Sequence, residues 1–139
     1  MKPIYLTVIS TVLTIAGFAQ VKVPAAVQNA FNAKFPAAAN VKWGKENARE
    51  YEAEFKLNNM DVSANFGIDG SWKETEATIP LIQLPAAVAG AVNSTYPGRP
   101  ILLTEKIEKS GGQTFYEVTI TYKGKSKELE LDEKGGFIK

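Results

Sequence analysis

An internal repeat constrains the fold of this chain more than any other feature. Residues 23–36 align without gaps with residues 84–97, and seven of the fourteen pairs are identical. Two further stretches also align, residues 51–55 with 116–120 and residues 66–73 with 131–138. The offset between the copies grows from 61 to 65, which places an insertion near Ser110. A duplicated sequence predicts one supersecondary unit that occurs twice.

Each copy is predicted to begin with a helix. Apolar side chains recur at three- and four-residue spacing and therefore share one helical face: Val27, Ala30, Phe31 and Phe35 in the first copy, and Val88, Ala91, Val92 and Tyr96 in the second. Pro24 and Pro85 suit the first helical position, where a missing N–H costs nothing. Pro36 and Pro97 end the helices, because the residue before a proline avoids the α region.

Strands are predicted to follow each helix. Apolar and polar residues alternate in three segments, residues 51–57, 60–68 and 116–122, and this period of two indicates one buried and one solvated face. Turn signals lie at Asn58-Asn59, Asp69-Gly70, Lys123-Gly124 and Gly135-Gly136. Further strands are expected near residues 40–46 and 100–108. The fold class is therefore α+β, with two tandem repeats that each pack a helix on an antiparallel sheet of about four strands.

Composition excludes several classes of function. The chain contains neither cysteine nor histidine, so thiol nucleophiles, Cys/His zinc sites and Ser-His-Asp triads are excluded. The formal net charge of +1 indicates no general affinity for nucleic acid. No cofactor is predicted, and the chain is not expected to be an enzyme.

The first nineteen residues have the pattern of a signal peptide. Lys2 precedes an apolar run from Ile4 to Ile15, and Gly17 and Ala19 suit the positions that a signal peptidase inspects. A membrane anchor is the alternative, but the run is shorter than the roughly 20 residues that span a bilayer. We therefore expect residues 1–19 to be removed, with Gln20 as the mature N-terminus and no membrane insertion afterwards. Residues 20–80 and 81–139 would then form the two repeats.

The chain resembles the PepSY-like domains of exported bacterial proteins, which are described as similar to the β-lactamase inhibitor protein. The segments that carry the resemblance are Pro24 to Pro36, Val41-Lys42-Trp43, residues 51–55 and Asp69-Gly70-Ser71-Trp72. The resemblance implies a periplasmic or secreted protein whose two sheets join into a curved surface, with helices on one side and an open face on the other. The inhibitor has disulfides, which a chain without cysteine cannot form, and its inhibitory loops have no match here.

The open sheet face is the candidate binding surface. Its predicted residues alternate with the core residues of the strands: Glu52, Glu54, Lys56, Asp61, Glu117, Thr119, Thr121, Glu128 and Glu130, with Ser63, Asn65 and Asp132 beside them. As a function this is a mildly acidic platform for a basic or polar partner. The alternative is an ordinary solvated strand face. Glu52, Glu54, Glu117 and Thr119 are expected to point into solvent.

Two other groups of residues are candidate sites. Trp43 and Trp72 could be exposed anchors of a binding site, although core packing is the favoured interpretation. Asp69 and Glu74 are weak candidates for calcium ligands, because carboxylate oxygens suit that ion, but Asp69-Gly70 is first of all a turn.

The sequence thus predicts a noncatalytic exported module that binds a protein or peptide and could inhibit an enzyme. A calcium- or small-ligand-responsive periplasmic protein is the alternative.

Overall fold

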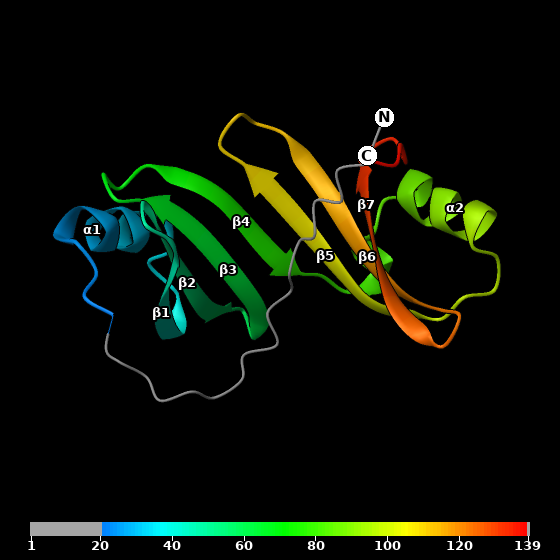
Figure 1. Ribbon diagram of the computed structural model, residues 1–139, viewed down its shortest axis with the longest axis horizontal. Coiled ribbons are helices and arrows are strands. Elements are labelled where there is room, and N and C mark those ends of the chain that lie inside the picture. Colours follow the sequence, from blue (N-terminus) through cyan, green and yellow to red (C-terminus); the bar gives the residue numbers. More distant parts are fainter. Residues whose placement is uncertain (1–20, 139) are drawn as a thin grey trace.

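The computed structural model describes residues 21–138, and the predicted signal peptide therefore lies outside the described residues. One antiparallel sheet contains all seven strands of this part of the chain, paired in chain order (Figure 1). The strands are β1 (Ala39–Asn47), β2 (Glu50–Leu57), β3 (Met60–Gly67), β4 (Trp72–Thr78), β5 (Ile101–Lys109), β6 (Thr114–Tyr122) and β7 (Lys125–Asp132). The α+β class is confirmed. Strands are also present at the two further segments, near residues 40–46 and 100–108.

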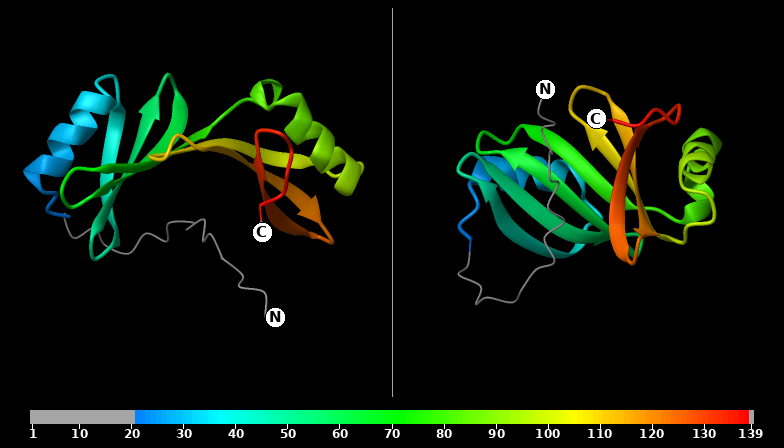
Figure 2. Two further views of the ribbon diagram at one scale, coloured as in Figure 1. Left: turned by 90° about the horizontal axis from the view of Figure 1, so that it is seen from above. Right: turned by 45° about the vertical axis from the view of Figure 1, so that its right-hand side comes forward.

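The helices lie at the two ends of the molecule, on one side of the sheet. They are α1 (Ala25–Lys34) and α2 (Ala86–Thr95), and a short 3-10 helix, η1 (Leu81–Gln83), precedes α2. Seen from above, the sheet curves so that the face opposite the helices is concave (Figure 2, left). Within residues 21–138 no helix is long and apolar enough to cross a membrane.

The sheet is continuous, with four strands before α2 and three after it. The expected number of about four strands per unit is therefore too high for the C-terminal half, where the chain turns after β7 and adds only an isolated bridge between Leu131 and Phe137. The connection between the halves is the antiparallel pairing of β4 with β5, which runs from Glu74 opposite Lys109 to Thr78 opposite Glu105.

Two separate cores lie between the helices and the sheet. Val27 and Phe31 of α1 pack with apolar residues of β2 and β3, and Val88 and Val92 of α2 pack with residues of β6 and β7. Phe31 is 3% exposed, as its helical spacing predicts. Its ring meets three others at edge-on angles, those of Trp43, Phe55 and Phe66. Such edge-to-face contacts stabilise aromatic clusters beyond simple burial.

Both tryptophans are half-buried at the edge of the first core. Trp43 and Trp72 pack against it, and the indole N–H of Trp72 donates a hydrogen bond of 2.9 Å to the hydroxyl of Thr75. The ammonium group of Lys34 lies 3.8 Å from the centre of the Trp72 ring. The interpretation of these residues as core residues is confirmed.

The predicted turns lie where the strands end. Asn58 and Asn59 both have positive φ and form a two-residue loop between β2 and β3, and Lys123-Gly124 does the same between β6 and β7. This pattern is that of type I′ hairpin turns.

Two local expectations were wrong. Ile68 was expected in the buried set of its strand, but β3 ends at Gly67 and Ile68 is 52% exposed, because its backbone already belongs to the turn. Pro24 precedes the first helical residue rather than occupying that position. Its carbonyl accepts hydrogen bonds from the N–H groups of Val27 and Gln28, so the proline caps the helix with its backbone.

Candidate functional site on the open face of the sheet

The strand register identifies the side chains on the open face, because directly opposed residues on neighbouring strands share a face. The predicted site residues are all on it. They pair as Glu52 with Asn65, Glu54 with Ser63, Lys56 with Asp61, Glu117 with Glu130, Thr119 with Glu128 and Thr121 with Ser126. The residues between them, such as Ala53 and Val118, belong to the two cores under the helices.

The exposure of one predicted residue differs from expectation. Glu54, Asp61 and Glu128 are exposed, and Glu52, Thr119, Thr121 and Glu130 are half-buried, as is Lys56. Glu117 is only 6% exposed, so the expectation that it points into solvent was wrong. It lies on β6, between Glu105 of β5 and Glu130 of β7, and strands on both sides of it reduce its contact with water.

Three carboxyl groups from neighbouring strands form the centre of this face. We call Glu76 of β4, Glu105 of β5 and Glu117 of β6 the central acidic cluster. Glu105 is directly opposite Glu117, and Glu76 is opposite Ile107, one position along the face from Glu105. Glu105 lies close enough to Glu76 for its negative charge to raise the pKa of the Glu76 carboxyl group.

Burial and mutual repulsion raise the pKa values of the central acidic cluster. Burial raises the pKa of Glu76 to about 8, with further contributions from the negative charges of Glu105, Glu117 and Glu74. Burial likewise raises the pKa of Glu117 to about 7, with Glu128, Glu105 and Glu130 adding to it. The pKa of Glu105 is raised by burial too. A carboxyl group that is desolvated near like charges favours its neutral form.

No cation of the described chain neutralises this cluster. Among residues 21–138 the open face has two ion pairs, Lys56 with Asp61 at 2.5 Å and Lys109 with Glu74 at 3.5 Å. Both involve carboxylates outside the cluster. Burial and the charges of Glu54 and Glu46 also raise the pKa of Glu52, so excess negative charge extends towards β2.

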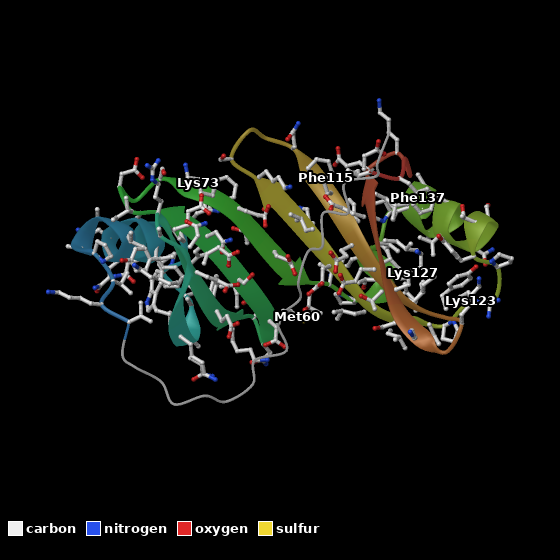
Figure 3. All side chains as sticks on the ribbon, viewed as in Figure 1. Met60, Lys73, Phe115, Lys123, Lys127 and Phe137 are labelled. Atoms are coloured by element: carbon white, nitrogen blue, oxygen red, sulfur yellow. The ribbon has the colours of Figure 1, made fainter. Side chains whose placement is uncertain are left out.

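Apolar side chains lie beside the central acidic cluster. Ile107 is 6% exposed, yet it belongs to neither core, because its register partners are Glu76 on β4 and Phe115 on β6. Phe115 is half-buried at the end of β6 near the β5–β6 turn (Figure 3). The open face therefore combines acidic and apolar surface, rather than the uniformly polar surface that the sequence indicated.

Sequence reasoning missed Glu105, Ile107 and Phe115 as parts of this face. Residues 101–109 place apolar and charged side chains on both faces of β5, so they show no clean alternation that would assign either face. Glu76 was not among the predicted binding residues. A signal that could have found the cluster is the large number of glutamates on strands on either side of the predicted junction.

The two weak calcium candidates make contacts with different residues. The carboxylate of Asp69 accepts hydrogen bonds from the N–H and hydroxyl of Ser71, at 3.0 and 2.6 Å, and these bonds lower its pKa. Glu74 lies on the open face beside Lys109, and Asp61 is at the opposite end of β3 from Asp69. In residues 21–138 no group of three or more acidic side chains is arranged to hold a metal ion.

Comparison with known proteins identifies relatives of this fold. A family model described as "Putative beta-lactamase-inhibitor-like, PepSY-like" matches residues 16–63 and residues 49–139. No curated protein matches the chain.

Several solved structures from Bacteroides are similar. A protein from Bacteroides eggerthii described as periplasmic is 20% identical, with a TM-score of 0.78 over 86% of this chain and 88% of that one. A DUF2874 family protein from Bacteroides ovatus is 22% identical, with a TM-score of 0.76 over 86% of each chain. A BLIP-like protein from Bacteroides fragilis is 25% identical, with a TM-score of 0.73 over 87% of this chain and 86% of that one.

Proposed function

Because this chain belongs to the family described as "Putative beta-lactamase-inhibitor-like, PepSY-like", we propose that it is a noncatalytic module that binds a protein partner on the open face of its sheet. The observation that carries the proposal is the shape of the sheet. Seven strands form one concave surface, and both helices lie on the other side. A continuous concave surface of this kind suits a convex part of another protein. An enzyme is one class of partner that such a module could inhibit.

We interpret the chain as two repeats, residues 20–80 and 81–139. The two matches to one family model support this division, and so do equivalent local geometries. The residues that follow the helices, Phe35 and Tyr96, have nearly the same backbone angles, with φ of −127° and −128° and ψ of 63° and 64°. Gly70 and Gly135 both have positive φ, and each lies against the first turn of a helix.

We also propose that residues 1–19 are a signal peptide and that the mature protein is periplasmic or secreted. The description of the Bacteroides eggerthii neighbour as periplasmic supports this location. N-terminal sequencing of the protein recovered from the periplasm is expected to begin at Gln20. A chain that retains Met1 would contradict the assignment.

Site-specific photo-crosslinking tests the binding surface. A photoreactive residue placed at Ser63 or Thr119, both half-buried on the open face, is expected to crosslink the same partner in periplasmic extract, and unlabelled protein should compete. The same residue placed at Asn93, which is exposed on α2, is the matched control and should give no such product. Equal crosslinking from Asn93, or none from either open-face position, would show that the partner does not bind this face.

A further inference from the structure

We propose that the partner inserts a basic side chain, lysine or arginine, at the middle of the open face. Its aliphatic part would pack on Phe115, beside the buried Ile107, and its cationic group would lie among Glu76, Glu105 and Glu117. This inference rests on the proposed function and specifies the chemistry of the partner at that surface.

The first observation is the burial of Glu117. Its side chain is 6% exposed, and within the described chain it takes part in no ion pair and no hydrogen bond contributes to its pKa. Its charged neighbours are Glu105, Glu128 and Glu130, all acidic. Among the described residues no fully buried side-chain oxygen lacks a partner, so the carboxyl group of Glu117 keeps an edge open to this face, and a carboxylate that is largely desolvated is costly unless it is paired or protonated. A cation supplied by a partner would pair with the Glu117 carboxylate and neutralise its charge.

The second observation is how charge is distributed between the two faces. The chain has 16 basic and 15 acidic residues, so its composition is balanced. The open face nevertheless has acidic side chains on every strand from β2 to β7: Glu52, Glu54, Asp61, Glu74, Glu76, Glu105, Glu117, Glu128 and Glu130. Its basic residues are Lys56, Lys109 and, on β1, Lys42, which is opposite Glu54.

The strands have further basic residues on the helix side of the sheet, where acidic residues are few. Lys45 lies near the ring of Tyr51, Lys106 is opposite the buried Tyr116, and Lys127 is opposite the buried Ile120. The two faces therefore differ in charge although the whole chain is nearly neutral. Complementary charge across an interface guides a partner to one face and sets its orientation, so the open face favours a basic partner.

The third observation is the apolar surface beside the carboxyl groups. Ile107 and Phe115 are direct register partners, and Ile107 is also opposite Glu76. The ammonium group of Lys109 already lies 5.0 Å from the centre of the Phe115 ring, which shows that this ring accepts a cation nearby. Lysine and arginine combine an apolar stem with a charged end, and both parts have a counterpart here.

The experiment uses two synthetic peptide amides of equal length, an Arg-Gly repeat and a citrulline-Gly repeat in which every cationic group is replaced by a neutral one. The mature protein is titrated slightly above pH 8 and followed by NMR and calorimetry. The arginine peptide is expected to bind and to shift the resonances of Ile107 and Phe115. The citrulline peptide should bind at least about tenfold more weakly, because each lost charge-assisted contact weakens binding by roughly that factor.

Two variants complete the test. The triple variant Glu76→Gln, Glu105→Gln, Glu117→Gln should lose the preference for arginine. Glu108→Gln is the control for loss of a carboxylate outside the cluster, because it removes one negative charge from the opposite face of β5, and it should bind like the unaltered protein. Equal binding of the two peptides, or an unchanged preference in the triple variant, would overturn the proposal. If Ser63 and Thr119 still crosslink the natural partner in the triple variant, the open face binds without a basic contact here, and the proposed function stands alone.

Discussion

At the scale of single residues, the central acidic cluster gives the open face its charge and weakens the free protein. Glu76, Glu105 and Glu117 are brought together by the register and are partly removed from water. A group whose pKa in the folded protein exceeds its value in the unfolded chain binds more protons in the folded state. The folded state therefore becomes less stable as these groups lose their protons. Such a conflict between stability and binding is common at functional surfaces.

We predict that replacement of Glu76 raises stability at neutral and higher pH. The pKa of Glu76 is raised from 4.5 to about 8, so the free energy of unfolding should fall as pH rises through this interval. The charged groups around it, Glu74, Glu105 and Glu117, all act in the same direction. Glu76→Gln should raise the melting temperature at pH 8, change it little at pH 5, and so flatten the pH dependence.

Thermal unfolding at several pH values measures this effect, with Glu108→Gln as the control for loss of one charge. Glu108 is exposed and paired with Lys106, so its replacement should have a small effect that does not grow between pH 5 and 8. A lower melting temperature of Glu76→Gln at pH 8 would mean that the carboxylate is stabilised in the folded protein by a partner that the register does not reveal.

At the scale of elements, glycines in two turns allow the sheet to approach the helices. A Cβ atom on Gly70 would lie 2.6 Å from the carbonyl oxygen of Ala26, and one on Gly135 would lie 2.5 Å from that of Ala87. Both glycines also have positive φ, 85° and 84°, which side chains rarely adopt. The turns after β3 and β7 thus determine how closely the first turn of each helix packs against the sheet.

Gly70→Ala is expected to destabilise the protein by more than about 1 kcal/mol, because both the backbone angle and the contact with Ala26 oppose a side chain. Gly90→Ala is the matched control. Gly90 lies within α2, and a Cβ atom there would meet nothing within 4 Å, so this change should stabilise the helix by about 0.5–1 kcal/mol. Chemical denaturation of both variants measures the two effects. Equal stability changes would show that the turn relaxes away from the helix.

At the scale of the whole molecule, two cores share one sheet. No buried residue belongs to both cores, and the halves meet through the pairing of β4 with β5. Hydrogen bonds of Thr104 with Ile79 extend this junction, with the Thr104 hydroxyl donating to the Ile79 carbonyl at 2.7 Å. The junction therefore holds the two halves in a fixed register through backbone pairing, while their apolar cores stay separate.

Phe31→Ala should reveal this partition. The change removes a ring that is 3% exposed and should cost about 3–5 kcal/mol. Because the second core contains no atom of the first, amide hydrogen exchange should accelerate far more in β2 and β3 than in β6 and β7. Val92→Ala in α2 is the converse control and should accelerate exchange in β6 and β7. Equal acceleration in all four strands after either change would show that the sheet unfolds as one unit.

Local patterns in the sequence predicted the helices and most of the strands. The spacing of Val27 and Phe31 determined the buried face of α1, and the alternation from Tyr51 to Leu57 determined the faces of β2, because each depends on a period of a few residues. Asn58-Asn59 predicted a hairpin turn, because asparagine tolerates the positive φ angles that a two-residue turn of this type requires. The predicted open-face residues were assigned to the correct face for the same reason.

Only the tertiary structure determined which residues of different strands become neighbours on the open face. Glu76, Glu105 and Glu117 are distant in sequence, and the pairing of β4 with β5 and of β5 with β6 makes them neighbours. Periodicity shows which side of a strand a residue occupies, but it contains no information on the register between distant strands or on the curvature of the sheet. The burial of Glu117 and the position of Ile107 outside both cores follow from that register, and so does the acidic centre of the concave face.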